Sequence, residues 1–552
     1  MIEISTRHTH LDAHTHTMAS STISPQTTTT DLDSLETFLK PLQIDRPLVH
    51  RLAQDLCSNF TDLAAQSDDQ FLPTPISESL LLQRAAVDSK DPGPHLAIDI
   101  GGTNLRVAFV ELSHVRKDGH NETTLPLRRH LEHSWPIDSQ LKNENHAVLF
   151  AWIGACIAEV VSKACAQFGI TATTELPLGI TFSFPMVQES LEKATLLQMG
   201  KGFGITSDLD LGCHLVDGYE KSRGDMPRIR VAAITNDAVA TLVSFMHQFP
   251  TTADTNGTTA IDVDRRPAMG LICGTGSNAT VFMDLESLKE SKRPRRVQTL
   301  PGQNGGPASI RIAVNTEWSI NGTAAPLRAY NLITSWDDHL SGAVERPGFQ
   351  PLEYMTAGRY LGELGRLILV DYMTKVLGLD STTLPAKLLR SFEPQNTTFL
   401  SHFRPEGNDW SMLVARLTNE FPSGPAFCWT EGLAQALYRI ARLIEYRAAG
   451  IIAASTLALL KCSGALPSAE ALASMYDRPT ELQLGVGYTG GCITNFQDYL
   501  QHCQQLLDDL AVREYPEAAS GGSRLRVVLQ PCHDGGIDGA AVLVPAAVAT
   551  GI

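Results

Sequence analysis

Short apolar runs followed by Gly, Asn or Asp alternate with long helical segments, and this alternation constrains the fold more than any other feature of the chain. The runs are LAIDI (96–100), VAAITND (231–237), MGLICGTG (269–276) and LQLGVGYTGG (482–491), with a further strand-like run at 178–184. Ala- and Leu-rich stretches of helical periodicity separate them, residues 32–65 before them also have helical spacing, and Pro73–Pro94 reads as a linker. This order predicts an α/β fold in which ligand-binding groups follow the ends of strands.

Length and charge narrow the class of protein. A chain of 552 residues exceeds one ordinary hydrophobic core, which predicts two lobes with a cleft between them. The composition, 43% hydrophobic and 19% charged, is that of a globular protein. A net charge of −16 without a dense Lys/Arg run argues against nucleic acid and anionic membranes as partners. We therefore expect a small-molecule substrate.

Cysteine usage and the first residues bear on the cellular setting. The 10 cysteines are scattered singly, without the spacing of a metal site or a disulfide framework, which favours a reducing, cytoplasmic environment. Residues 1–31 read as a disordered Thr/Ser-rich tail, to which we assign no metal-binding role despite four alternating histidines: His8, His10, His14 and His16. The longest uncharged apolar stretches, near 448–460 and 540–552, are too short to cross a bilayer, so no membrane anchor is expected.

The segment Asp99–Asn104, DIGGTN, joins two strand-like runs and predicts a hairpin. Two glycines let backbone N–H groups approach phosphate oxygens, and the adjacent carboxylate can hold Mg²⁺ through its water shell. An ordinary hairpin turn, which uses Gly for its positive φ, explains the hexapeptide equally well.

The segment Gly274–Ala279, GTGSNA, has the G-x-G-x-x-A spacing of a dinucleotide fingerprint, but an apolar run follows it at once where a helix is required. We interpret it as a second phosphate-binding hairpin, in which Thr275 donates to a phosphate oxygen. The chain contains no G-x-x-x-x-G-K-[ST] motif, which excludes a P-loop.

Further acidic, amide and basic residues suit a polyhydroxylated ligand, because each buried sugar hydroxyl needs both a donor and an acceptor. These candidates are Lys201, Asn236, Asp237, Glu317 and Glu353. Each alone is weak evidence, since most such residues are solvated surface groups.

The ordered series DIGGTNLR, TFSFP, KGF, ITND, GTGSN, NTEW, PGFQPLE and MTAGRYLGEL resembles the eukaryotic hexokinase family from about Leu32 to the C-terminus. The resemblance implies an actin-like, ribonuclease-H-like fold of two lobes and ATP-dependent phosphorylation of a sugar 6-hydroxyl. It also implies a domain layout: N-terminal helices and a linker on the large lobe (32–94), a small lobe (95–234), a large lobe (235–537) and a C-terminal helix returning to the small lobe (538–552).

The resemblance also implies site residues. The sugar would contact Ser183, Phe184, Lys201, Asn236, Asp237, Asn278, Glu317 and Glu353. The ATP phosphates would lie against Asp99, Gly101, Gly102, Thr103, Asn104, Gly274, Thr275, Gly276, Gly358, Gly490 and Gly491. Asp237 would act as the base and Lys201 would add positive charge. Mg²⁺ would be held through water by Asp99, with no direct protein ligand.

Three segments depart from the family pattern. Met199-Gly200 replaces Trp-Thr, Thr489-Gly490-Gly491 replaces Asp-Gly-Ser/Thr, and Gly535–Gly539 replaces Gly-Ser-Gly-x-Gly. A non-catalytic sugar sensor and a subfamily with altered substrate both fit these changes. We favour the second, because the pattern at Gly487–Phe496 resembles fungal N-acetylglucosamine kinases of the family; the alternative substrate is glucose.

Overall fold

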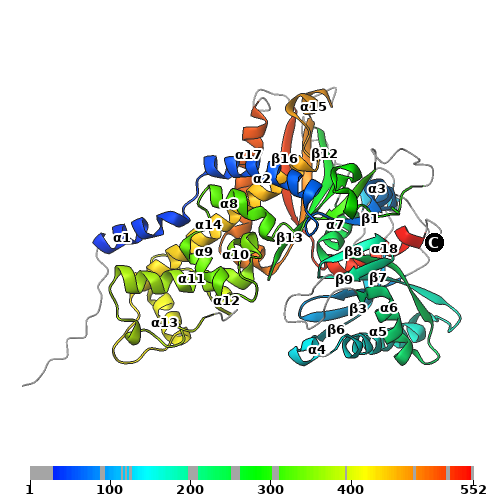
Figure 1. Cartoon of the computed structure of the whole chain (residues 1–552), viewed down its shortest axis with the longest axis horizontal. Coiled ribbons are helices and arrows are strands. Elements are labelled where there is room, and N and C mark those ends of the chain that lie inside the picture. Colours follow the sequence, from blue (N-terminus) through cyan, green and yellow to red (C-terminus); the bar gives the residue numbers. More distant parts are fainter. Residues whose placement is uncertain are drawn as a thin grey trace, which may run out of the picture.

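The computed structural model describes residues 29–86, 94–112, 116–118, 121–123, 127–143, 145–196, 209–249, 262–300, 310–391, 395–475, 480–516 and 523–548. Two lobes, each built on its own mixed β-sheet with helices packed around it, lie side by side (Figure 1). The α/β, two-lobed prediction is confirmed.

The small lobe contains a five-stranded sheet in the order β11-β7-β2-β3-β6. Its strands are β2 (His95–Ile100), β3 (Asn104–Glu111), β6 (Arg128–Pro136), β7 (Glu175–Phe182) and β11 (Arg228–Thr235). The predicted hairpin is present, since β2 pairs antiparallel with β3, while β7 runs parallel to both β2 and β11. The shorter strands are β4 (Arg116–Asp118), β5 (Asn121–Thr123), β8 (Met186–Ser190), β9 (Lys193–Leu196) and β10 (Leu209–Asp210).

Helices α4 (Ser139–Asn143), α5 (His146–Phe168) and α6 (Leu211–Arg223) also belong to the small lobe (Figure 1). The backbones of α5 and α6 touch, because a Cβ atom on Gly154 would lie 2.1 Å from the carbonyl carbon of Gly218. Glycine at both positions is therefore what lets the two helices approach each other.

The large lobe contains a six-stranded sheet in the order β1-β14-β13-β12-β15-β16. Its strands are β1 (Leu72–Ser77), β12 (Asp262–Cys273), β13 (Ser277–Asp284), β14 (Arg311–Asn315), β15 (Thr480–Thr489) and β16 (Arg524–Pro531). Strands β12, β13 and β14 form an antiparallel meander, and β15 and β16 continue the sheet in parallel.

The helices of the large lobe surround the long, buried α14 (Glu431–Cys462), which packs against α2 (Arg46–Gln66) and α17 (Tyr499–Glu514). The others are α1 (Thr29–Leu39), α3 (Glu78–Ala86), α7 (Asp237–Gln248), α8 (Ala324–Ala329), α9 (Ser335–Ala343), α10 (Pro351–Thr356), α11 (Gly358–Asp371), α12 (Gln395–Ser401), α13 (Ser411–Glu420), α15 (Ala469–Ser474) and α16 (Gly491–Asn495). Helices α1 and α2 cover most of the stretch predicted to be helical, 32–65.

The C-terminal helix α18 (Gly535–Val548) lies between the two sheets. It packs against β7 and β2 of the small lobe and against α7, which in turn covers β12 of the large lobe (Figure 1). The approach is close on both sides: a Cβ atom on Gly179 would lie 2.0 Å from the carbonyl oxygen of Ala540, and one on Gly539 would lie 2.1 Å from that of Ala240. The N-terminus of α18 is thereby fixed at the junction of the lobes.

The predicted linker at 73–94 is wrong for the residues that the structure describes up to Ala86. Residues 72–77 form β1, and α3 follows directly. The prolines Pro73 and Pro75 suggested a linker, but β1 is an edge strand, where a residue without an N–H is tolerated. This segment therefore belongs to the large-lobe sheet.

Two helices, α5 and α14, are long and apolar enough to cross a membrane by composition. Their most apolar windows are 56% and 89% buried inside the fold, as in core helices of folded domains.

All 10 cysteines lie in described ranges and are free thiols. The four tail histidines lie outside the described residues.

Candidate active site

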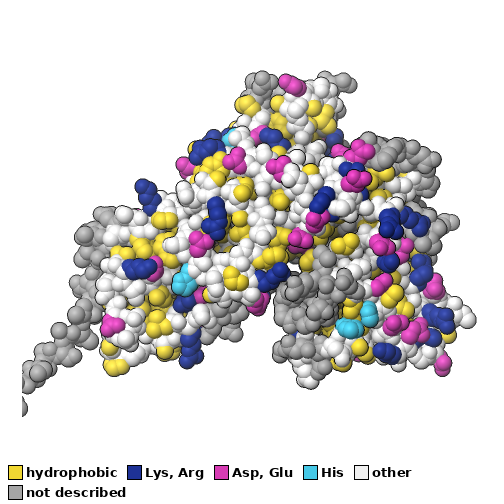
Figure 2. Space-filling model, in the orientation of Figure 1, with side chains coloured by type: hydrophobic (Ala, Val, Ile, Leu, Met, Phe, Trp, Pro, Cys, Tyr) yellow, Lys and Arg dark blue, Asp and Glu magenta, His cyan; other side chains and the backbone are white. Residues whose placement is uncertain are grey.

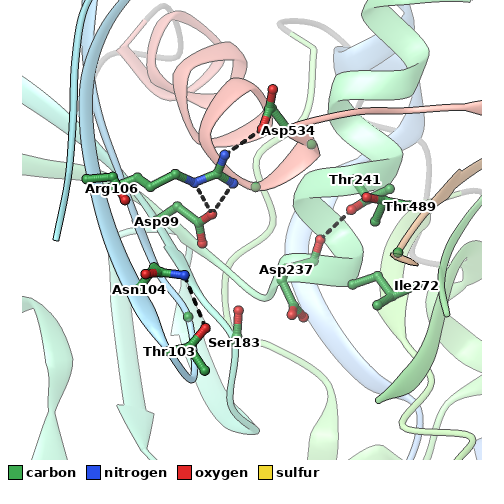
Figure 3. A pocket seen from close by; sticks show the side chains of 15 residues that line it. Asp99, Thr103, Asn104, Arg106, Ser183, Asp237, Thr241, Ile272, Thr489 and Asp534 are labelled. Atoms are coloured by element: carbon green, nitrogen blue, oxygen red, sulfur yellow. Dashed lines mark hydrogen bonds and ion pairs between the residues drawn. The ribbon is translucent and has the colours of Figure 1, made fainter. Parts of the chain in front are cut away.

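The predicted phosphate-binding turn forms one wall of a cavity of about 420 Å³ between the lobes (Figure 3). The turn closes through a hydrogen bond from the Gly101 N–H to the Asn104 carbonyl, 2.9 Å. The cavity is lined by Asp99, Gly101, Thr103, Asn104, Arg106, Ser134, Ser183, Asp237, Thr241, Ile272, Thr489, Gly490, Asp534, Gly535 and Gly536. Strand ends and turns from both lobes therefore meet at this site.

The Asp99 carboxylate is held by Arg106, which lies opposite it in the β2–β3 ladder. Arg106 donates to Asp99 Oδ2 from Nη2 at 2.6 Å and from Nε at 3.2 Å, and from Nη1 to Asp534 Oδ1 at 2.6 Å. Burial raises the pKa of Asp99, Arg106 opposes that rise, and the nearby charges of Asp237 and Asp534 add to it. The site thus gathers negative charge around one arginine.

Asp237 is the first residue of α7 and is separated from the end of β11 only by the N-cap residue Asn236. The Asn236 side chain caps this helix by accepting from the Ala238 N–H at 2.8 Å, and Thr241 Oγ1 donates to the Asp237 carbonyl at 2.8 Å. These two bonds fix the backbone on either side of the carboxylate. Figure 3 shows the Asp237 carboxylate facing the cavity from the wall opposite Asp99.

The second predicted hairpin is also present, since β12 and β13 pair antiparallel across Gly274–Gly276. The Gly358 N–H donates to the Gly274 carbonyl at 2.8 Å. Gly490, at φ 124°, lies against the same turn, because a Cβ atom there would be 2.3 Å from the Cys273 carbonyl oxygen. Three of the four glycine segments predicted to bind phosphates, those at Gly274–Gly276, Gly358 and Gly490, therefore meet at this turn.

Three of the predicted sugar-contacting residues lie along β13 and the segments next to it. Asn278 Nδ2 donates to Glu317 Oε1 at 3.2 Å, and Asn315 Nδ2 donates to the same oxygen at 2.9 Å. Glu353 Oε2 accepts from the Ser277 N–H at 3.0 Å and presses against Gly276, where a Cβ atom would lie 2.8 Å from that oxygen. Carboxylates and amides held in this way suit hydroxyl ligands.

The remaining predicted site residues lie in different places relative to the cavity. Ser183 lines the cavity with Asp237, but the Phe184 ring is 2% exposed and packs on Phe182, with ring centroids 5.0 Å apart. The Phe184 side chain is therefore part of the small-lobe core. Gly102 lies in the first turn and Thr275 in the second. Lys201 lies outside the described residues.

Sequence reasoning missed Arg106, Thr241 and Asp534, which the cavity includes. Arg106 was within reach of that reasoning, since a hairpin that pairs Ile100 with Leu105 across a turn at 101–104 places residue 106 opposite Asp99. No local sequence pattern marks Asp534 as a site residue. It lies in the site because it directly precedes α18, which is positioned between the lobes. Burial raises its pKa, but hydrogen bonds and charge from Arg106 and Arg129 outweigh burial, so the net shift is downward.

The charge of the cavity suits a divalent cation. Its lining carries three carboxylates, Asp99, Asp237 and Asp534, against the single guanidinium of Arg106. Oxygen ligands and excess negative charge are what Mg²⁺ requires, and it commonly keeps several water ligands beside one or two carboxylates. The residues present therefore fit the Mg²⁺ that nucleotide-dependent phosphoryl transfer needs.

The fold matches solved structures of hexokinases. A hexokinase from Schistosoma mansoni complexed with glucose superposes with a TM-score of 0.67 at 22% identity, over 94% of this chain and 99% of that one. A second hexokinase crystal structure gives the same TM-score at 19% identity, over 94% of this chain and 100% of that one. At this level of identity the matches establish the fold.

Sequence comparisons give the same family. Hexokinase-2 of Solanum tuberosum is 27% identical over 461 residues, which cover 82% of this chain and 79% of that protein. Hexokinase-2 of Homo sapiens is 29% identical over 383 residues, 68% of this chain but 36% of that protein. Two hexokinase family models match residues 34–247 and 268–546. The second covers half of the chain by itself, and the chain belongs to the hexokinase family.

Proposed function

We propose that this protein transfers the γ-phosphoryl group of ATP to the 6-hydroxyl of a hexose or N-acetylhexosamine. The observation that carries the proposal is the placement of Asp237 and the Asp99–Asn104 turn in one cavity of about 420 Å³. A candidate base and a phosphate-binding turn in one cavity are what in-line phosphoryl transfer needs.

Asp237 would accept the proton of the attacking hydroxyl as the oxygen bonds to phosphorus and ADP leaves. Its backbone is fixed by the Asn236 cap and by Thr241, so the carboxylate is oriented before substrate arrives. Mg²⁺, when bound near Asp99, would offset the negative charge of the phosphates. The Gly101 and Gly102 backbone can approach phosphate oxygens, and we expect Lys201 to contribute further positive charge.

The hydroxyls of the sugar would be met by Asn278, Glu317 and Glu353. Asn278 and Asn315 both donate to Glu317 Oε1, which holds the carboxylate in a position where it can accept from a sugar hydroxyl. Glu353 is 9% exposed, and its carboxylate accepts a hydrogen bond from the Ser277 N–H. This carboxylate is therefore also oriented before the sugar binds. Closure of the lobes would exclude water, the competing acceptor.

We further propose that N-acetylglucosamine is preferred over glucose. Met199-Gly200 stands where the family has Trp-Thr, and the turn at Gly487–Phe496 has the pattern of fungal N-acetylglucosamine kinases. Loss of a bulky ring would make room for a 2-acetamido group. A general glucose kinase is the alternative within the family.

A small-molecule role agrees with the molecular surface. Figure 2 shows acidic and basic side chains interspersed over this face, without one large patch of a single sign. A reducing, cytoplasmic setting remains our proposal; the free thiols are compatible with it.

The direct test is a coupled assay of ADP release from Mg-ATP by purified full-length protein with glucose, mannose, fructose, glucosamine and N-acetylglucosamine. We expect turnover with at least N-acetylglucosamine or glucose. Sugar binding by calorimetry without turnover of any of the five sugars would replace the kinase with a non-catalytic sugar sensor. That sensor is the second candidate, because the late turn lacks the usual Asp at Thr489.

A further inference from the structure

Glu317 has a backbone conformation that its surroundings must maintain. Its φ is 44°, in the left-handed region that non-glycine residues rarely adopt. Its carboxylate accepts from Asn278 and Asn315, at 3.2 Å and 2.9 Å. The direction of that carboxylate depends on the left-handed backbone, because rotation of φ would swing the side chain away from both amides.

One side of the Glu317 segment is held by β13. The Thr316 N–H and Oγ1 both donate to the Ala279 carbonyl, at 3.0 Å and 2.9 Å. Trp318 Nε1 donates to Ser277 Oγ at 3.1 Å. These bonds flank Glu317, and within the same loop the Ile320 N–H donates to the Glu317 carbonyl at 3.2 Å.

The other side is held by Gln70, a residue that no motif singled out. Gln70 lies just after α2, is 2% exposed, and donates from Nε2 to the Glu317 carbonyl at 2.9 Å. The neighbouring Phe71 N–H donates to the Thr316 carbonyl at 3.0 Å. The Gln70 Oε1 atom packs against Gly322, where a Cβ atom would lie 1.9 Å from it. Gln70 thus occupies a space that only glycine at 322 leaves open.

We propose that Gln70 is a positioning residue for the sugar-binding site, acting through the backbone of Glu317. The inference rests on the proposed function, in which Glu317 accepts a hydrogen bond from a sugar hydroxyl. Without the Gln70 amide, the Glu317 carbonyl keeps the 3.2 Å bond from the Ile320 N–H of its own loop but loses the bond that ties it to the segment after α2, so the left-handed backbone is held less firmly. The carboxylate then loses its alignment, while the Asp99–Asn104 turn of the small lobe is unaffected.

The test is Gln70→Leu, which keeps much of the side-chain volume and removes the donor. We expect KM for the sugar to rise and kcat/KM for the sugar to fall on the order of tenfold. A small displacement of an aligned binding group has an effect of this size. KM for Mg-ATP should stay within about twofold of wild type, since the side chain of Gln70 bonds to the Glu317 loop and does not line the cavity with the Asp99–Asn104 turn. Thermal unfolding and ADP binding, measured on the same samples, show whether the variant is folded.

Asn59→Leu is the matched control. Asn59 Nδ2 donates to the Gly322 carbonyl at 3.1 Å, so it holds the same loop from α2 without reaching Glu317. If Gln70 merely stabilises the loop, the two variants should change sugar KM equally, and that result would overturn the proposal. A rise in sugar KM for Gln70→Leu, with the sugar KM of Asn59→Leu close to that of wild type, supports the proposal.

A double-mutant cycle with Glu317→Gln gives a second readout. Because Gln70 acts through Glu317, the double variant should lose sugar kcat/KM no further than the worse single variant does. Additive losses would show that Gln70 acts by another route. A wild-type protein that neither binds nor phosphorylates sugar would overturn the proposed function and the role of Gln70 together, whereas an active wild type with an unaltered Gln70→Leu overturns only the latter.

Discussion

Gly536 lies directly against the carboxyl group of Asp99: a Cβ atom on Gly536 would be 2.6 Å from Oδ2 and 2.8 Å from Cγ. Because Arg106 holds that carboxylate through two hydrogen bonds, Asp99 cannot move aside without losing them. A side chain at position 536, where the family pattern has Ser, would therefore displace Asp99 in this chain.

The first prediction is that Gly536→Ala impairs the phosphate side of the site. Displacing Asp99 should raise KM for Mg-ATP and lower kcat/KM for Mg-ATP about tenfold or more, with sugar binding nearly unchanged. Steady-state kinetics with each substrate varied in turn would measure this. Gly342→Ala is the control, because a Cβ atom at Gly342 meets nothing within 4 Å. Equal effects of both variants would remove Asp99 from this explanation.

Asp237→Ala is the second prediction. Loss of a positioned base should lower kcat by at least ~10²-fold while sugar affinity, measured by calorimetry, weakens less. Asp338→Ala, which removes an exposed carboxylate paired with Arg328, should leave kcat unchanged. Near-normal kcat in the Asp237 variant would mean that another group takes the proton.

Much of the site could be predicted because it is encoded in short segments. The turns at Asp99–Asn104 and Gly274–Gly276, and Asn236-Asp237 at the end of β11, are local patterns whose backbone chemistry does not depend on the rest of the fold. Sequence reasoning was weaker where a side chain acts over long separations. Asp534 meets Arg106 across 428 positions and Gln70 meets Glu317 across 247, and neither sequence segment signals the contact.

Packing also determined how two predicted segments are placed. Phe184 is a predicted sugar contact by its position in the family motif, and its ring packs into the core on Phe182. Pro73 and Pro75 were interpreted as part of a linker, although tertiary pairing with β14 makes their segment an edge strand. In both cases packing that local sequence does not encode determined the outcome.

Substrate choice is the third prediction. We expect a higher kcat/KM for N-acetylglucosamine than for glucose. The double variant Met199→Trp with Gly200→Thr, at positions outside the described residues, should lose N-acetylglucosamine turnover selectively through overpacking of about 1–3 kcal/mol. Equal loss on both sugars would indicate a damaged loop, and a wild type that prefers glucose would refute the proposed preference.

The fourth prediction concerns the ion pair between Arg129 on β6 and Asp538 on α18. Arg129 donates to Asp538 from Nε at 2.9 Å and from Nη2 at 3.1 Å, and its Nη1 lies 2.9 Å from Asp534 Oδ2. Arg129→Met would leave two carboxylates together at the N-terminus of α18. We expect a loss of about 2–4 kcal/mol in the free energy of unfolding, toward the lower end because the Arg129 side chain is 27% exposed. Adding Asp538→Asn should recover part of the loss, as measured by urea denaturation.

The same pair gives the last prediction, a dependence on pH. Burial raises the pKa of Asp538, and the hydrogen bond from Arg129 opposes that rise without cancelling it. A carboxyl whose pKa is higher in the folded state than its unfolded value of about 3.9 binds its proton more tightly when folded. The stability linked to that proton is therefore complete below about pH 4 and is lost as pH rises through the folded-state pKa.

Asp538→Asn mimics the protonated form at every pH. Its melting temperature relative to wild type should therefore increase as pH rises from about 4 through the folded-state pKa, and then level off. In the Arg129→Met background, where the opposing hydrogen bond is absent, the same comparison should give a larger increase over a wider pH range. Melting curves of the four proteins at closely spaced pH values would measure both effects. A difference that shrinks with rising pH would mean that Arg129 outweighs burial and that the pKa of Asp538 is lowered by folding.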